Sequence, residues 1–357
     1  MPTDKKNQHY IPKFYLRNFS FNGNKKQIGL FNINNSFFHE TAKLKTQGSK
    51  NFYYGVDGII EDGLAEIEGI ISKTLKKIIE DKQVPKKDSQ DYFNLLMFIV
   101  LTDLRNPVRI EGSKKMFQEM RDNILSIAPD SDVDSLVPRM SHDEHIKMCL
   151  SQTPHLMEVI YDLDYKLIIN ETDIPFITSD FPILKYNRFL EEKKWVGTKA
   201  AFGNIGLKIF IVINHQISLV FFDSAIYKVG NKRDKMVRLD NNEDINQLNL
   251  LQITNCLDTV YFDEKVKKEY ILNIFEKSKQ FTKANLTTSQ LSYIVREGEE
   301  ISDKQNLMIL GSTDSEIKLN ISVIKIHSKG KSTKLNVSMS QLRKHPEMLR
   351  RKKNDYR

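Results

Sequence analysis

The sequence predicts an α+β fold in which a helical first half packs on a mostly antiparallel sheet from the second half. Apolar residues recur at helical spacing through much of residues 57–160, whereas β-branched and aromatic runs dominate residues 161–323. Helices grouped early and strands grouped late are typical of this class. The length of 357 residues predicts one large domain over residues 1–323, followed by a final strand and a basic tail over residues 324–357.

The first hundred residues combine the alternating pattern of strands with the spacing of helices. Alternation around the Asn-Asn pair at 34 and 35 predicts a short β-hairpin, and the aromatic run "KNFYYG", residues 50–55, predicts another strand. Residues 58–81 then change to helical spacing, because their isoleucines and leucines fall on one stripe. "YFNLLMFIVLTDLRNPVR", residues 92–109, is apolar nearly all round, which predicts a buried helix that ends before its proline.

Helices continue through residues 110–160, and the character of the chain then changes. Strands are expected in "YKLIIN", "PFITS", "LKIFIVIN" and "ISLVFFD", of which the last two form a hairpin across Asn214 and His215. Helix is expected again from "DINQLNLLQITNCLDTVYF" to about Gln290. "IKLNISVIKIHS" predicts a closing strand.

The net charge of +8 is concentrated at one end of the chain. Residues 324–357 contain eleven Lys and Arg and two acidic residues, a net charge of +9, which leaves −1 for the rest. Such a tail is either a solvated basic segment or a surface that binds nucleic acid, since Lys and Arg clusters give sequence-independent affinity for phosphates. Only the second alternative predicts salt-sensitive binding.

Apolar runs and cysteines indicate where the protein works. The longest apolar run, "LLMFIVL" from Leu95 to Leu101, is too short to span a bilayer, so we expect no membrane association. The first residues are charged and no apolar stretch follows them, which argues against a secretory signal. Cys149 and Cys256 stand alone in the sequence, as is typical of a reducing compartment. These features favour a cytoplasmic location.

The segment "QHYIPKFYLRNF", residues 8–19, is unusually aromatic for the start of a chain. Chain ends are normally polar and poorly ordered, so this segment is expected to be buried or to bind something. It contains His9 and Arg17. A histidine is the side chain most ready to move protons near neutral pH, although one beside tyrosine and proline is often only a packed group.

Two glutamates lie at the border of the first clear helix. Glu61 and Glu68 fall to the same side of its apolar stripe, neither in the core nor in open solvent. Seven residues separate them, which is about 10 Å along a helix, so other elements would have to help them hold one ion. Either they form salt bridges with arginines, or one of them faces a cleft as a general base or metal ligand.

Further charged residues stand at the ends of predicted elements. Ser179 and Asp180 follow the strand in "NETDIPFITSDFPI", where an aspartate either caps the backbone or projects into a cleft. Arg105 closes the buried helix and needs an anionic partner, and Arg109 follows it. The acids and the arginines therefore either build a site or neutralise each other.

These motifs together resemble an uncharacterised, mainly bacterial family, domain of unknown function 4238. The matching pieces occur in the family's order: "QHYIPKFYLRNF", "FYYG", "IEDGLAEIEGIISKTLKKI", "LRNPVR" and "FITSDFPI". The resemblance implies that motif positions of the family fall on these residues: His9, Pro12, Arg17, Glu61, Glu68, Arg105, Ser179, Asp180 and Pro182. It brings no established reaction with it. Phe181 departs from the small polar residue that is common after the Ser-Asp pair.

Two functions compete on this basis. The first is a metal-dependent nuclease, or phosphodiester hydrolase, in bacterial anti-phage defence or a toxin system. In it His9 or Glu68 moves the proton, Arg105 stabilises charge on phosphate, and Mg²⁺ or Mn²⁺ is held by Asp180 with Glu61 and Glu68. Its substrate contacts are expected from Arg17, Arg109 and Ser179. The alternative is a non-enzymatic nucleic-acid- or protein-binding module in which the same charges form a structural ion-pair network.

Overall fold

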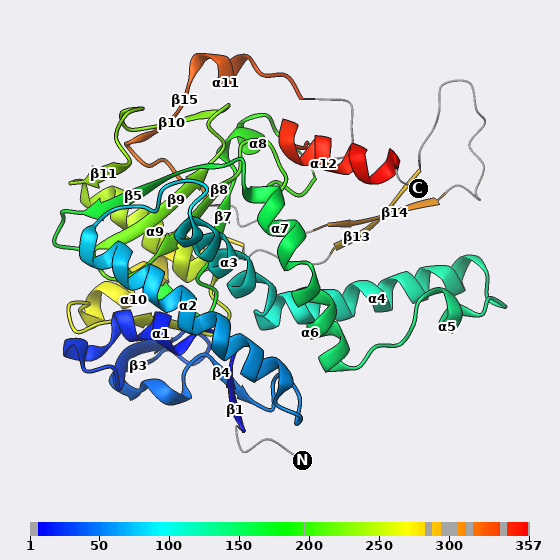
Figure 1. Cartoon of the computed structure of the whole chain (residues 1–357), viewed down its shortest axis with the longest axis horizontal. Coiled ribbons are helices and arrows are strands. Elements are labelled where there is room, and N and C mark those ends of the chain that lie inside the picture. The colour runs from blue at the N-terminus through cyan, green and yellow to red at the C-terminus, as the bar shows by residue number, and fades with distance from the viewer. Residues whose placement is uncertain are drawn as a thin grey trace.

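The expected α+β class is confirmed by a computed structural model, which describes residues 6–195, 197–282, 288–293, 306–311, 317–335 and 341–355. Figure 1 shows the body of the molecule with an arm that projects from it. The α-helices are α1 (Lys13–Leu16), α2 (Ile59–Asp81), α3 (Gln90–Leu104), α4 (Pro107–Ile127), α5 (Val133–Leu136), α6 (His142–Ser151), α7 (Thr153–Ile160), α8 (Arg188–Glu192), α9 (Asn242–Asn255), α10 (Lys268–Ser278), α11 (Ser328–Ser332) and α12 (Lys344–Asp355). The strands are β1 (Asn7–His9), β2 (Gln27–Asn32), β3 (Phe37–Lys43), β4 (Ser49–Asn51), β5 (Asp164–Asn170), β6 (Thr178–Ser179), β7 (Leu184–Tyr186), β8 (Lys208–Val212), β9 (Ile217–Phe222), β10 (Tyr227–Val229), β11 (Met236–Leu239), β12 (Thr259–Phe262), β13 (Thr288–Tyr293), β14 (Asn306–Gly311) and β15 (Ile324–Ile326).

A five-stranded sheet organises the second half of the chain. Its order is β11-β5-β9-β8-β7, with β11 parallel to β5 and the other neighbours antiparallel. The expected hairpin joins β8 to β9, and Phe210 lies opposite Val220 in its register. Every residue of both strands is buried, so both faces of the sheet must be covered.

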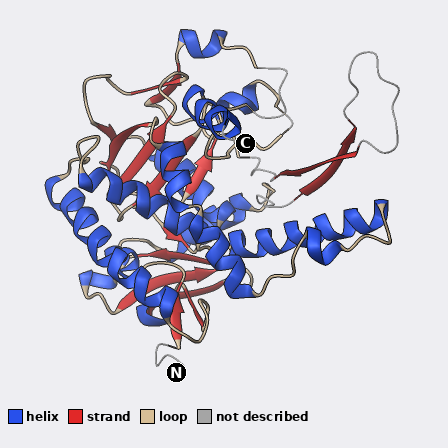
Figure 2. Cartoon of the chain, turned by 45° about the vertical axis from the view of Figure 1, so that its right-hand side comes forward, coloured by secondary structure: helices blue, strands red, loops and turns tan. Residues whose placement is uncertain are grey.

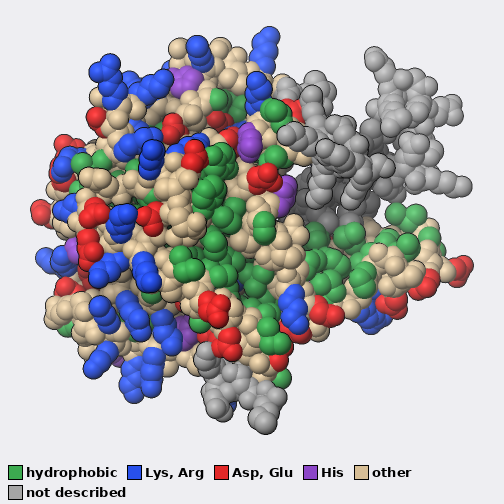
Figure 3. All heavy atoms as spheres, viewed as in Figure 1, with side chains coloured by type: hydrophobic (Ala, Val, Ile, Leu, Met, Phe, Trp, Pro, Cys, Tyr) green, Lys and Arg blue, Asp and Glu red, His purple; other side chains and the backbone are tan. Residues whose placement is uncertain are grey.

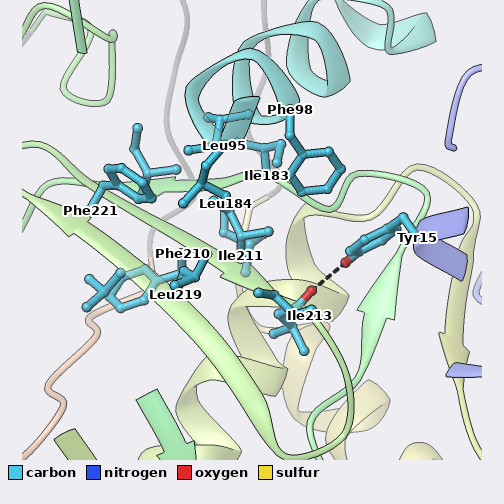
Figure 4. Close-up of a cluster of buried hydrophobic side chains, with 14 of the residues drawn as sticks. Tyr15, Leu95, Phe98, Ile183, Leu184, Phe210, Ile211, Ile213, Leu219 and Phe221 are labelled. Carbon is cyan, nitrogen blue, oxygen red and sulfur yellow. Dashed lines mark hydrogen bonds between the residues drawn. The ribbon is translucent and has the colours of Figure 1, made fainter. Parts of the chain in front are cut away.

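Helix α3 covers one face of this sheet. Figure 4 shows Leu95 and Phe98 of α3 above Ile211, Leu219 and Phe221 of the two central strands. The helix is buried along nearly its whole length, which explains why its sequence is apolar nearly all round. Its amino-terminal end is capped, because the Ser89 side chain accepts a hydrogen bond from the backbone N–H of Tyr92. On the sheet α9 packs against β11 and β7.

The aromatic opening segment is tied into this core. Tyr15 is fully buried and its hydroxyl donates a hydrogen bond of 2.7 Å to the backbone carbonyl of Val212 (Figure 4). The same hydroxyl lies 2.6 Å from Oγ1 of Thr178. Ile11, Leu16 and Phe19 are also fully buried. The aromatic composition of residues 8–19 is therefore explained by packing.

A second sheet joins distant parts of the sequence, in the order β3-β2-β12-β6. The hairpin of β2 and β3 was expected, but helix was expected through Phe262, and that expectation is wrong for Thr259–Phe262, which form strand β12. The four residues are β-branched or aromatic, and pairing with β2 on one side and β6 on the other satisfies their backbone. Strand β2 has no room for a side chain at Gly29, because a Cβ there would clash with the Phe262 ring of the neighbouring strand β12.

Three further expectations hold only in part. Strand β4 ends at Asn51, so the aromatic residues 52–54 lie in the turn that follows it. The closing strand is shorter than predicted, because only Ile324–Ile326 within residues 317–328 pair, antiparallel to β10. The helix expected to about Gln290 is wrong at its end, because α10 stops at Ser278 and residues 288–290 belong to strand β13, which pairs with β14. Residues 283–287 lie outside the described residues.

The helices after α3 form the projecting arm. Figures 1 and 2 show α4 leaving the body, with α5 beside its far end and α6 returning along its base. Asn106 caps α4 and Pro107 occupies its first turn, so the "LRNPVR" motif is a junction between two helices. Arg121 holds α5 to the arm through Asp134, at 2.6 Å. Within the described part of the chain, no helix has the length and apolar character needed to cross a membrane.

Candidate binding site

The structure places His9 inside the protein. Its side chain is buried, and its Nε2 lies 3.1 Å from the backbone carbonyl of Lys45. Burial, together with the nearby Lys13 charge, lowers the pKa of His9 to about 4. The imidazole is therefore neutral at pH 7 and its Nε2–H is held by a carbonyl. This is how a packed histidine behaves.

Arg105 and Glu68 form the ion pair that the sequence allowed. The Arg105 side chain is 2% exposed, and its Nη1 lies 2.6 Å from Oε1 of Glu68. Its Nε has no hydrogen-bond partner among the described residues, and neither has Oγ1 of Thr102. Both side chains line a cavity of about 10 Å³. A cavity of that size accommodates one water molecule and is too small for a nucleotide.

Asp180 is occupied by the backbone of a neighbouring segment. Its carboxylate accepts hydrogen bonds of 2.7 to 2.8 Å from the N–H groups of Leu257, Asp258 and Thr259, just before β12. Burial raises the pKa of Asp180 to about 6, although the three amides favour the charged form. Ser179 is equally enclosed, because its Oγ accepts from the N–H of Phe181 and from the side-chain amide of Gln252. Both side chains hold β6, β12 and α9 together.

The remaining predicted residues do not complete a metal centre. Glu61 lies in the first turn of α2. It is close to Tyr54, whose pKa is raised mainly by burial; the Arg105 charge lowers this pKa and the Glu61 charge raises it. Arg17 is exposed in a short 3-10 turn. Among the described residues, no group of three or more His, Cys, Asp or Glu side chains is arranged to hold a metal ion. The donor set of Glu61, Glu68 and Asp180 therefore does not fit Mg²⁺ or Mn²⁺.

A second charged cluster lies where α3 meets α4. Arg109 forms a bidentate salt bridge with Asp103, in which Nε donates to Oδ2 at 2.9 Å and Nη2 donates to Oδ1 at 3.0 Å. Lys185 of β7 places its Nζ 3.2 Å from Oδ1 of the same carboxylate. Burial opposes ionisation of Asp103, but Arg109 and Lys185 hold its pKa below the usual value. We call these three side chains the Asp103 cluster.

The Asp103 cluster opens into a cavity of about 600 Å³. Its walls come from the end of α3, from α4, α7 and β7, from residues 198–203, and from the segment around α12. Most of the lining is apolar, and it consists of Leu104, Leu156, Val159, Ala200, Ala201, Phe202, Gly203, Leu342, Pro346 and Leu349, with Asp103, Arg109, His155, Lys185, Thr198 and Arg350 as its polar members. A volume of this order is typical of small-molecule sites.

Part of the basic tail forms one wall of this cavity. Arg343 is buried and pairs with Asp162, at 2.9 Å from its Nη2 to Oδ1. It also donates hydrogen bonds to the backbone carbonyls of Phe202, Asn204 and Val159. Residues 341–350 are thus anchored to α7 and to the loop before β8, and Figure 1 shows α12 beside α7.

Sequence reasoning found Arg109 but missed its surroundings. Asp103 was hidden in a helix that is apolar on all sides, and Lys185 follows it by 82 residues. The tail carried a signal that could have been used: Leu342, Pro346 and Leu349 recur at helical spacing among the basic residues. An apolar stripe of this kind predicts docking rather than free solvation.

Basic side chains are unevenly distributed over the face of the described residues that Figure 3 draws. Figure 3 shows Lys and Arg side chains spread over the visible face, with a dense group over the amino-terminal elements near α1 and β3. Acidic side chains are mixed among them over much of this face (Figure 3). Nucleic-acid binding by the tail, residues 324–357, stays a prediction.

The fold and this cavity define a class of protein: an α+β protein with a mostly apolar pocket that ends at a pair of cations. Its relatives are identified by sequence. The chain belongs to the family described as protein of unknown function (DUF4238), whose model matches residues 7–266. No curated protein and no solved structure matches the chain.

Proposed function

We propose that this protein is a non-enzymatic binding module that holds an anionic ligand in the 600 Å³ cavity, with Arg109 and Lys185 as the recognition groups. One observation carries this proposal. Arg109 uses only one edge of its guanidinium, Nε and Nη2, to hold Asp103. Its Nη1 makes no hydrogen bond to the residues that the structure describes, and the side chain is 22% exposed. A planar guanidinium with a free edge in a pocket is suited to bidentate binding of an anion.

The charge balance of the Asp103 cluster supports the same conclusion. One carboxylate and two cations give a formal charge of +1. Among the described residues that line the cavity, Asp103 is the one acidic side chain. Because the walls are apolar, water screens this charge less than it would at the surface. An anion that enters the cavity gains a favourable interaction there.

The hydrolase hypothesis has weaker support. It needs carboxylates that are available to a metal ion, but Asp180 is engaged by three backbone amides and Glu68 by Arg105. It also needs a proton carrier, and burial keeps His9 neutral at pH 7. The hypothesis is tested by incubating labelled RNA and DNA with Mg²⁺, Mn²⁺ or a chelator, beside His9→Ala and Asp180→Ala. Metal-dependent cleavage that both folded variants lose would restore the hydrolase and displace the binding proposal.

The binding proposal is tested with a panel of anions in calorimetric titrations. The panel contains monocarboxylates, alkyl phosphates, mononucleotides and short single-stranded RNA and DNA. We expect at least one class to bind the wild type, and to bind Arg109→Gln at least tenfold more weakly. Arg233→Gln is the matched control, because Arg233 is exposed and does not line the cavity. Equal binding by wild type and Arg109→Gln, or no binding by any class, would refute the proposal.

The compartment belongs to the same proposal. Cys149 and Cys256 are both buried and neither forms a disulfide. We propose a cytoplasmic location, where such thiols stay reduced. Fractionation of the native host with detection of the protein by antibody tests it, and recovery outside the cytoplasm would contradict it.

A further inference from the structure

We infer that the ligand of the cavity is a small monocarboxylate with an apolar body, of the size of a medium-chain fatty acid or an aryl-substituted propionate. The inference rests on the proposed function, since it assumes that Arg109 recognises an anion. It goes further by assigning the charge of that anion and the chemistry of what is attached to it.

The charge follows from the Asp103 cluster. Its formal charge of +1 becomes zero when one carboxylate enters. A phosphate monoester would bring about −1.5 to −2 at pH 7 and would leave an excess negative charge between apolar walls. A charge that lacks a partner in such surroundings is costly. Arg350 and His155 also line the cavity, but both are exposed to solvent, where screening weakens their contribution.

The geometry of Arg109 favours the same group. Asp103 occupies the Nε and Nη2 edge, and the remaining edge presents Nη1 together with the second hydrogen of Nη2. Two parallel N–H donors match the two oxygens of a carboxylate. Lys185 contacts the same Asp103 carboxylate and adds a positive charge close by. The ligand carboxylate would thus share Arg109 with Asp103.

The apolar body follows from the walls beyond the cations. Leu156 and Val159 of α7 face the cavity together with Leu342 and Leu349 of the tail segment. Phe202 adds a ring, but the Nζ of Lys185 already lies 4.3 Å from its centroid. Among the lining residues that the structure describes, Phe202 has the one phenyl, phenol or indole ring, so they provide no open pair of rings to stack a nucleobase. Aliphatic walls instead suit an alkyl chain or a single aryl group.

The experiment is a calorimetric chain-length series. Hexanoate, octanoate and decanoate, each below its micelle concentration, are titrated into the full-length wild type, and octyl phosphate, octylamine and AMP serve as comparison probes. We expect the dissociation constant of the carboxylates to fall about fourfold for each added methylene, which corresponds to about 0.8 kcal/mol. Octyl phosphate should bind at least fivefold more weakly than octanoate, and octylamine and AMP should not bind measurably.

Three variants locate the binding. Arg109→Gln should weaken octanoate binding at least tenfold, and Arg109→Lys should weaken it to an intermediate degree, because it keeps the charge and loses the two-pronged edge. Ala201→Phe, which fills the cavity from a lining position, should abolish binding while the melting temperature shows that the protein is folded. Arg233→Gln should bind octanoate as the wild type does.

The outcomes separate this inference from the proposal beneath it. If octyl phosphate or AMP binds through Arg109 and the carboxylates do not, the monocarboxylate inference is overturned and the binding function stands. If octylamine binds as tightly as octanoate, the cavity recognises apolar chains without their charge, and both fail. If no probe binds, or if Ala201→Phe binds octanoate normally, the inference is overturned as well.

Discussion

Two clusters of charge lie near the end of α3, and they differ in what holds their members. The Glu68 and Asp180 carboxylates are engaged by Arg105 and by backbone amides, and the cavity beside Arg105 has room for about one water molecule. In the Asp103 cluster, two cations share one carboxylate beside a cavity of about 600 Å³. A candidate site is therefore distinguished from a structural network by a hydrogen-bond donor, here Nη1 of Arg109, beside a cavity large enough for a ligand. The number of charges does not distinguish the two.

The largest effect is expected from Asp180→Ala. The substitution leaves three partly buried backbone N–H groups of residues 257–259 without their acceptor, so we expect a loss of about 3 kcal/mol in the free energy of unfolding. Urea denaturation measures it. Asp130→Ala, at an exposed position, is the control and should change stability by less than about 0.5 kcal/mol. An Asp180→Ala protein as stable as the wild type would contradict the structural role assigned to this carboxylate.

The next effect is a dependence of stability on pH that comes from His9. Its pKa is about 4 in the folded protein and about 6.5 in the unfolded chain, so the folded state binds the proton less well. Protonation of His9 in the unfolded chain therefore lowers the free energy of unfolding by roughly 3 kcal/mol as the pH falls from 6.5 towards 4, and above pH 6.5 the full stability is present. His9→Gln, which keeps a donor for the Lys45 carbonyl, should flatten the stability curve in this range. His39→Gln, at an exposed position, should leave the wild-type curve unchanged.

A smaller effect is expected from Glu68→Gln. The buried Arg105 then loses its anionic partner, but Glu68 is 24% exposed and solvent can reach part of the gap, so we expect about 2 to 3 kcal/mol of destabilisation. Glu66→Gln is the matched control, because Glu66 is exposed on the same helix and should cost less than about 0.5 kcal/mol. Equal stability of the two variants in thermal melts would show that the ion pair contributes nothing.

The smallest effect is expected from Arg17→Gln. Arg17 is an exposed cation away from the cavity, so the substitution should change the melting temperature by no more than about 1 °C and leave ligand binding intact. A clear loss of binding in this variant would extend the site to the amino-terminal segment, where the sequence motifs had placed it.

Local patterns made much of the fold predictable. The stripe of Leu64, Ile71 and Leu75 identified α2, and the apolar run of α3 was rightly assigned to a buried helix. Strand β12 was missed because its four residues follow a helical stretch directly and pair with β2, more than 220 residues earlier. Partners at such separations leave no trace in local periodicity.

The candidate site was harder to predict for the same reason. Arg105 and Glu68 were both singled out from the sequence, and they do form a pair. Whether an acid is available cannot be seen locally, however: the three amides that engage Asp180 come from residues 257–259. The cavity is assembled from α3, α7, β7 and the tail, and only the tertiary fold brings these segments together.

The central claim is that Arg109 recognises an anion in the cavity. The most direct measurement is the dissociation constant of octanoate for Arg109→Gln and for Arg233→Gln, determined by isothermal titration calorimetry at one salt concentration. We predict at least tenfold weaker binding by Arg109→Gln and agreement within twofold between Arg233→Gln and the wild type. Equal dissociation constants for the two variants would contradict the account.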